Sequence, residues 1–236
     1  MKPGTNPLQH AASATAMVDF GAQVHRASKG QGADFATILS KAAGESRLDN
    51  SAKNPRSTAT GAFQFVERTW LDLVRRHGDA IGRGDLAQAV TVVDGKPTVR
   101  DAALKKTILD LRKDPNTAAM LTARYAEENR AALRRGTGRD PSQSELAMAH
   151  LLGAQGAVKL ITAAAGTPAD EIVGGAVRAN PTLFHDSTGR VRTAGEAREF
   201  LTRKFDAERS RAAPQAQLAA AIAQGLEKLD AAPAMV

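Results

Sequence analysis

The stretch AAGESRLDNSAKNPRSTATGAFQFVERTW, residues 42–70, decides how the rest of the chain is interpreted. Immediately before and within its first residues, apolar side chains recur at helical spacing between positions 35 and 43. The helix that this spacing predicts ends near Glu45, so a carboxylate falls on or beside a buried stripe. A loop rich in Asp, Asn, Ser and Pro follows, and it runs into Gly61 and the apolar segment 62–66.

A carboxyl group in this position is suited to acid catalysis. Burial disfavours the charged form and raises the pKa of a carboxyl such as that of Glu45. A protonated carboxylic acid at neutral pH is what protonation of a glycosidic oxygen requires. Gly61 permits an unusual backbone turn, and Gln64 offers a donor and an acceptor to sugar hydroxyl or acetamido groups. Phe63 and Phe65 are candidates for the apolar wall of a cleft.

The same residues also fit a purely structural interpretation. Glu45 is then the last polar residue of an amphipathic helix, paired with Lys41 or Arg47. Phe63 and Phe65 are then core residues, as large aromatic side chains usually are. Periodicity alone leaves both interpretations open.

The composition points to a mainly α-helical protein. The chain has 236 residues, of which 42% are hydrophobic and only 4% aromatic, and alanine, the best helix former, is abundant. There is no cysteine, so no disulfide forms. The formal net charge of +7 suits an anionic partner such as nucleic acid, a membrane surface or cell wall, although a basic solvated surface has the same signature.

We expect three regions along the chain. Residues 1–30 have a weak pattern and are predicted to be a tail, residues 31–206 a catalytic domain, and residues 207–236 a C-terminal helical extension that Pro214 separates from the rest. Val-Val-Asp-Gly and Pro-Thr-Val between positions 92 and 99 predict a small hairpin or an extended loop. Capping boxes, which start helices, are predicted at two pairs of residues: Ser142 with Glu145, and Thr193 with Glu196.

The order of the motifs is similar to that of a known family. Glu45-Ser46, followed after a loop by Gly61-Ala62-Phe63-Gln64, resembles the soluble lytic transglycosylase family of the lysozyme-like superfamily. That family has Glu-Ser, then Gly-Leu-Met-Gln, then Ala-Tyr-Asn-x-Gly. The third motif here is Ala-His-Leu-Leu-Gly at 149–153, with His150 in place of the usual tyrosine and leucine in place of asparagine. The resemblance covers about residues 33–160.

The resemblance implies a mainly α, lysozyme-like helical domain that cleaves the β-1,4 bond between N-acetylmuramic acid and N-acetylglucosamine in peptidoglycan. A single Glu45 would act as acid and then as base, with the substrate's own groups giving a 1,6-anhydro product. No cofactor and no metal are implied. The residues implied to contact the glycan strand are Ser46, Gly61, Phe63, Gln64, Phe65, Tyr125 and His150.

Several alternatives stay open. Ordinary glycoside hydrolysis uses a second carboxylate, for which Asp49 and Glu67 are candidates, and water would then make the enzyme a hydrolytic muramidase. An inactive basic module that binds cell wall or serves as a scaffold is a further alternative. The chain shows no helix-turn-helix pattern and no aromatic-basic interleaving, so nucleic acid is not expected as a partner.

A peptidoglycan substrate implies the cell envelope or periplasm. The first 20 residues lack the apolar core of 7–15 residues that an ordinary secretory signal has, and no run is long and apolar enough for a membrane span. A secretion, flagellar or phage apparatus would explain delivery without a standard signal.

Overall fold

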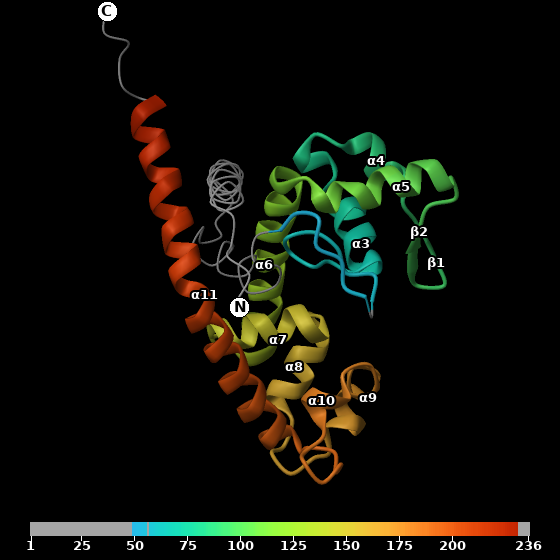
Figure 1. The fold of residues 1–236 in the computed structure, drawn as a ribbon. Coiled ribbons are helices and arrows are strands. Elements are labelled where there is room, and N and C mark those ends of the chain that lie inside the picture. Colours follow the sequence, from blue (N-terminus) through green and yellow to red (C-terminus); the bar gives the residue numbers. More distant parts are fainter. Residues whose placement is uncertain (1–48, 56, 231–236) are drawn as a thin grey trace, which may run out of the picture. The chain divides into compact units, whose positions relative to one another are not determined.

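A computed structural model of the chain describes residues 49–55 and 57–230 (Figure 1). The expected tail at 1–30, the helix expected over 35–43, and the residues Glu45 and Ser46 lie outside the described residues. Within the described residues the protein is mainly helical and has one small antiparallel sheet, which confirms the predicted fold class at that level. The lysozyme-like fold stays a prediction.

The described chain divides into two compact units. Unit 1 contains residues 49–124 and 211–230, and unit 2 contains residues 125–210. The boundaries fall inside two long helices, α6 (Pro115–Thr137) and α11 (Ala194–Asp230). The catalytic domain expected over 31–206 therefore includes parts of both units, and it stays a prediction.

Unit 1 is built around α3 (Glu67–His77). Its core-facing side is made by Trp70 and by neighbouring leucine and valine side chains that are fully buried. The indole Nε1 of Trp70 donates a hydrogen bond of 2.7 Å to the carbonyl oxygen of Ile108, so the largest side chain of the core is also satisfied as a donor. The other elements of this unit are η1 (Asp79–Ile81), α4 (Gly84–Ala89), α5 (Ala102–Asp110), η2 (Leu111–Lys113) and the first part of α6.

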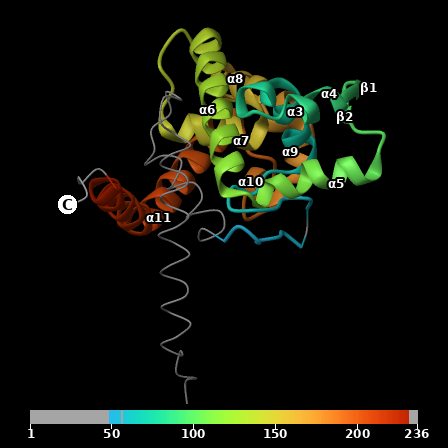
Figure 2. The same cartoon turned by 90° about the horizontal axis from the view of Figure 1, so that it is seen from above.

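The predicted hairpin is present in unit 1. Strands β1 (Thr91–Val93) and β2 (Lys96–Thr98) pair antiparallel with Val93 opposite Lys96. The two turn residues, Asp94 and Gly95, have φ angles of 49° and 68°, the left-handed conformation that a two-residue hairpin turn needs. Figure 2 shows the two strands projecting from the helices of this unit.

Two aspartates start the helices on either side of η2. The side chain of Asp101 accepts a hydrogen bond from the backbone N–H of Leu104 at the start of α5, and Asp114 accepts one from Thr117 at the start of α6, each at 2.7 Å. Pro115 is the first residue of α6, where a missing N–H costs nothing. The chain direction therefore changes between α5 and α6 at a site that the local sequence specifies.

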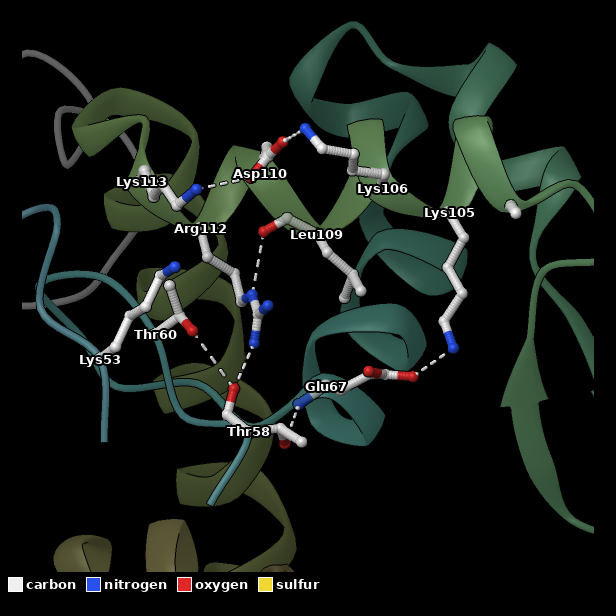
Figure 3. Close-up of a pocket in the computed structure, with 11 residues that line it drawn as sticks. Lys53, Thr58, Thr60, Glu67, Lys105, Lys106, Leu109, Asp110, Arg112 and Lys113 are labelled. Atoms are coloured by element: carbon white, nitrogen blue, oxygen red, sulfur yellow. Dashed lines mark hydrogen bonds and ion pairs between the residues drawn. The ribbon is translucent and has the colours of Figure 1, made fainter. Parts of the chain in front are cut away.

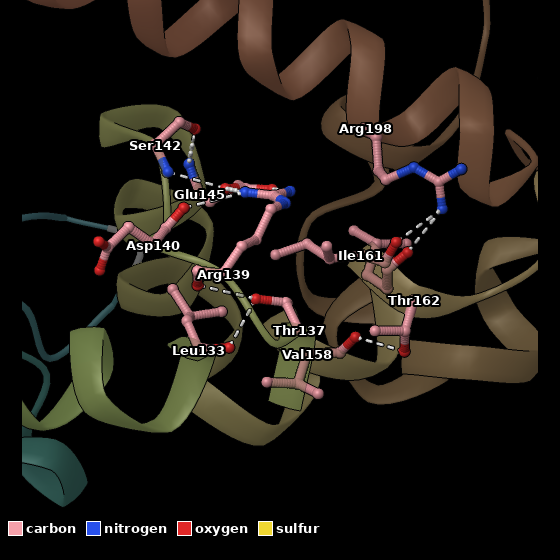
Figure 4. A network of polar contacts seen from close by, with 11 residues as sticks. Leu133, Thr137, Arg139, Asp140, Ser142, Glu145, Val158, Ile161, Thr162 and Arg198 are labelled. Atoms are coloured by element: carbon pink, nitrogen blue, oxygen red, sulfur yellow. Dashed lines mark hydrogen bonds and ion pairs between the residues drawn. The ribbon is translucent and has the colours of Figure 1, made fainter. Parts of the chain in front are cut away.

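Unit 2 packs short helices around a continuous apolar core. This core is made mainly of alanine, leucine and valine, with Phe184 as its largest fully buried side chain. Arg198 of α11 donates through Nη1 to the carbonyl oxygens of Leu160 and Ala163, both at 2.9 Å, and thereby caps the end of a neighbouring helix (Figure 4). The helices of this unit, besides parts of α6 and α11, are α7 (Gln143–Leu152), α8 (Ala154–Thr162), α9 (Ala169–Ala179) and α10 (Pro181–Phe184).

One local motif occurs twice in unit 2, as Gly-Arg-x-x-Ser/Thr-x-x-Glu at 138–145 and 189–196. In both copies the Ser or Thr and the Glu form the predicted capping box, which confirms both predictions. In both copies the arginine also donates hydrogen bonds from Nη1 and Nη2 to the two carboxylate oxygens of the same glutamate. We call the pairs Arg139–Glu145 (Figure 4) and Arg190–Glu196 the Arg–Glu clamps.

The predicted break at Pro214 is wrong. Helix α11 runs without interruption from Ala194 to Asp230 and includes Pro214. Proline inside a helix removes one hydrogen bond and costs roughly 3 kcal/mol, which is why it predicts a break. Ala213 before it and Gln215 and Ala216 after it are strong helix formers and favour continuation of the helix on both sides.

Candidate functional site

The segment 58–66, which precedes α3, folds back on itself. The N–H of Thr60 donates to the carbonyl oxygen of Phe65 at 3.3 Å, and the N–H of Gly61 donates to that of Ala52 at 2.8 Å. These bonds tie the segment both to its own end and to the preceding loop. We call residues 58–66 the Gly61 loop.

Gly61 is required at its position for two reasons. Its φ angle is 80°, in the left-handed region that side chains other than glycine rarely adopt. A Cβ atom added there would lie 2.0 Å from the carbonyl oxygen of Arg112, which is backbone and cannot rotate away. The expectation of an unusual turn at Gly61 is confirmed, and its cause is a close approach by a distant segment.

Gln64 adopts a left-handed conformation as well, with a φ angle of 49°. Its side-chain Nε2 donates to the carbonyl oxygens of Gly61 at 2.9 Å and Ala52 at 3.2 Å. Both donor hydrogens of the amide are therefore used inside the fold. Its Oε1 has no hydrogen-bond donor among the described residues, so this acceptor is what the side chain offers to a ligand.

The aromatic residues of the Gly61 loop point into the core. Phe63 and Phe65 are 1% and 2% exposed, and the ring of Phe65 lies 5.5 Å from that of Trp70. The structure therefore favours the interpretation of both rings as core residues that support the loop. A direct contact of their side chains with a sugar would require this loop to open.

Arg112 holds the Gly61 loop from the other side. Its side chain is drawn in Figure 3, and the residue is only 8% exposed. Its Nη1 donates to the carbonyl oxygens of Thr58 at 2.6 Å and Phe65 at 3.1 Å, and its Nε donates to that of Leu109 at 2.9 Å. One buried cation thus ties both ends of the loop to the end of α5. Burial lowers the pKa of Arg112 from its usual value.

The remaining predicted site residues fall into two groups. The predicted acid Glu45 and its neighbour Ser46 lie outside the described residues. Tyr125 and His150 lie together in unit 2, with ring centroids 5.7 Å apart in an edge-to-face arrangement. Their roles in substrate binding stay predictions.

The two candidate second carboxylates are both engaged in local interactions. Asp49 accepts hydrogen bonds of 2.7 Å from the backbone N–H and the hydroxyl of Ser51. Glu67 forms an ion pair of 2.6 Å with Lys105. A role for either in catalysis would have to compete with these partners.

An open groove of about 490 Å³ lies beside the Gly61 loop, entirely within unit 1 (Figure 3). Thr58 and Thr60 of the loop form part of its wall, and α5 and η2 form the opposite part. Among the residues that the structure describes, five basic and two acidic residues line it. The charged lining residues are Lys53, Glu67, Lys105, Lys106, Asp110, Arg112 and Lys113. We call this the basic groove.

Asp110 is held in its charged form in the basic groove. Hydrogen bonds from Lys106 and Lys113 lower its pKa to about 2. The ammonium groups of both lysines lie 2.6 Å from its carboxylate oxygens. One carboxylate therefore partly compensates two cations and leaves an excess of positive charge.

Neither the basic groove nor the role of Arg112 is visible in the sequence alone. The basic residues at 105, 106, 112 and 113 are visible as a cluster in the sequence, but a cluster of this kind usually marks a solvated helix face. The carbonyl oxygens that Arg112 binds lie 47 and 54 residues away along the chain, so no local pattern indicates this contact.

In the part of the chain that the structure describes, no group of three or more His, Asp or Glu residues is placed to hold a metal ion. None of the helices described there is long and apolar enough to cross a membrane. No protein-family model matches the sequence.

Proposed function

We propose that this protein is a peptidoglycan-cleaving enzyme of the lytic transglycosylase type, with Glu45 as its acid and base. The proposal is supported by the motif order Glu45-Ser46 then Gly61-Ala62-Phe63-Gln64. It places the substrate glycan against the Gly61 loop and assigns Gln64 to the binding of a sugar hydroxyl or acetamido group.

The observation that carries the proposal is the way in which the Gly61 loop is preorganised. The close approach of the Arg112 backbone leaves no room for a side chain at position 61. The side chain of Gln64 is held in place by two hydrogen bonds that its own amide donates. A binding loop that is already rigid loses little conformational entropy when a ligand binds. Such a cost in local strain is commonly found where a loop serves function.

The proposed reaction needs one carboxyl group of the protein. Glu45 donates its proton to the glycosidic oxygen, and the bond from that oxygen to C1 of N-acetylmuramic acid breaks. The acetamido oxygen of the same sugar assists this departure. The carboxylate of Glu45 then accepts the proton of the 6-hydroxyl, whose oxygen bonds to C1 and closes the 1,6-anhydro ring. Asp49 is hydrogen-bonded to Ser51 and Glu67 is paired with Lys105, which is compatible with a reaction that uses neither carboxylate.

The decisive variant is Glu45→Gln, which retains the shape of the side chain but cannot transfer a proton. We expect cleavage of purified sacculi to fall by at least about 100-fold, the low end of what a positioned acid contributes. Glu171→Gln is the matched control, because Glu171 is exposed on α9 in unit 2 and its replacement by glutamine removes the same charge. Thermal unfolding of both variants checks that the fold is retained.

The products and the other carboxylates separate the alternatives. Mass spectrometry of the released muropeptides should show products lighter by one water than hydrolytic ones. Hydrolytic products together with a large loss of activity in Asp49→Asn or Glu67→Gln would instead indicate a muramidase with two carboxylates. Wild-type cleavage by Glu45→Gln, or no cleavage by the wild-type protein, would overturn the proposal and favour a wall-binding module.

A further inference from the structure

We propose that the basic groove is a binding site for a short acidic peptide, with the guanidinium of Arg112 and the ammonium groups of Lys53 and Lys113 binding its carboxylates. This site is distinct from the glycan contacts proposed for Gln64. It does not require Glu45 to be catalytic, so it can be tested without any cleavage.

Arg112 is the feature that makes the groove more than a basic surface. It is buried, and three of its N–H groups are used by the carbonyl oxygens of Thr58, Phe65 and Leu109. Its Nη2 has no hydrogen-bond acceptor among the described residues. Since Arg112 lines the groove, an oxygen of an anionic ligand would satisfy this nitrogen.

The surrounding charges leave the groove positive. Lys113 shares Asp110 with Lys106, and Lys105 is paired with Glu67. Lys53, on the opposite wall, has no ion-pair partner in the described part of the chain. Figure 3 shows Lys53 on the same side of the groove as Thr60, with Arg112 and Lys113 facing it. Two walls therefore offer cations to one ligand.

The mixture of charges favours a peptide over a nucleic acid. Glu67 and Asp110 line the groove together with the lysines, and each would repel a continuous chain of phosphates. None of the described residues that line the groove is aromatic, so these residues provide no platform on which bases could stack. A peptide with separated carboxylates can place them at the cations, and its apolar groups can contact Ala102 and Leu109. The peptides that are attached to glycan strands are one source of such carboxylates.

The test measures binding to the full-length protein at low salt by fluorescence anisotropy. The probe is a labelled peptide of six residues with alternating Glu and Ala, and the counter-probes are the same peptide with Gln in place of Glu, inorganic phosphate as a competitor, and single-stranded DNA. We expect the Glu peptide to bind at least about tenfold more tightly than the Gln peptide, because charge-assisted hydrogen bonds are lost in the latter.

A charge-matched pair of double variants locates the site. Lys53→Gln with Lys113→Gln should weaken binding of the Glu peptide about tenfold, since two cations next to the ligand are lost. Lys96→Gln with Lys159→Gln removes the same charge from β2 and α8, outside the groove, and should change binding less than about twofold, because distant exposed charges are screened. Equal weakening by the two double variants would overturn the proposal.

Arg112→Lys provides a second, sharper variant. It retains the positive charge but loses the planar donor group, so we expect weaker binding with little change in the salt dependence. Its thermal unfolding is measured in parallel, and if it does not fold, the lysine variants decide. Tighter binding of DNA than of the peptide, or competition by phosphate as strong as that by the unlabelled Glu peptide, would also overturn the proposal.

Discussion

The two units use arginine in opposite ways to hold the segment that precedes a helix. In unit 1, Arg112 is buried and binds backbone carbonyl oxygens of the Gly61 loop, which lies far away in the sequence. In unit 2, the Arg–Glu clamps join residues six positions apart, and the arginines Arg139 and Arg190 are more than half exposed. The first device connects distant parts of the chain, and the second strengthens a local cap.

This difference has an energetic consequence. A buried guanidinium that is removed leaves carbonyl oxygens without partners in a place that water reaches poorly, and that penalty is large. An exposed arginine that is removed leaves a carboxylate that water can solvate, and the loss is small. Unit 1 should therefore be sensitive to single changes at its loop, whereas unit 2 should tolerate the loss of either clamp.

The largest expected effect is that of Gly61→Ala. The methyl group would clash with the carbonyl oxygen of Arg112, and the alanine would have to adopt a left-handed φ angle. We therefore expect a loss of about 2–4 kcal/mol in the free energy of unfolding. Gly189→Ala is the matched control, because Gly189 has a φ angle of 85° but nothing within 4 Å of an added Cβ. Its expected loss is about 1 kcal/mol, measured by the same chemical denaturation. Equal losses would show that the approach of Arg112 does not matter.

The next largest effect comes from replacing Arg112 or Arg139 by methionine. Arg112→Met leaves three carbonyl oxygens without their donor, and we expect a loss of about 3 kcal/mol. Arg139→Met breaks an exposed clamp and should cost less than about 1 kcal/mol. Denaturation of both variants under the same conditions gives the comparison directly. A cost for Arg139→Met as large as that for Arg112→Met would contradict the distinction between buried and exposed arginines.

The smallest effect is the dependence of the clamps on pH. Hydrogen bonding by Arg190 and by the N–H of Thr193 lowers the pKa of Glu196 from 4.5 to about 2, and Arg139 likewise lowers the pKa of Glu145. Because the folded state holds these carboxylates charged, their contribution is complete above about pH 4.5 and is lost as the pH falls toward 2.

Melting temperatures of the wild type, Glu145→Gln and Glu196→Gln between pH 7 and 2.5 test this expectation. Each variant should melt below the wild type at pH 7, and the difference should shrink in acid. Added salt should reduce the difference more for Glu196, whose side chain is 43% exposed, than for Glu145, at 13%. A difference that is constant with pH would exclude the clamps as its cause.

Much of the fold can be predicted because its signals are local. The caps at Asp114, Ser142 and Thr193 join groups within one helical turn, so the spacing of residue types is sufficient to find them. The hairpin turn at Asp94 and Gly95 depends on the conformations that these two residues allow. The mainly helical class follows from composition and periodicity, which sum over many residues.

The candidate site could be predicted only in part. Gly61 and Gln64 were identified by a motif; both have left-handed backbone conformations, and the close approach of Arg112 explains why position 61 must be glycine. The Arg–Glu clamps could be predicted only in part: the capping box is a known sequence pattern, whereas the arginine that binds its glutamate is not part of that pattern. Helix α11 continues through Pro214. The helix propensities of the many residues around the proline together outweigh the unfavourable contribution of that one residue.

The amino-acid sequence alone was sufficient for the two capping boxes and the hairpin turn, which close within a few residues of chain, and for the mainly helical class, which follows from composition and periodicity. Only the three-dimensional structure decided that Arg112 meets the carbonyl oxygens of Thr58 and Phe65, that Gly61 must therefore lack a side chain, and that a basic groove forms beside them. The physical reason is that local contacts are determined by residue type and spacing, whereas contacts between distant segments depend on the path of the whole chain.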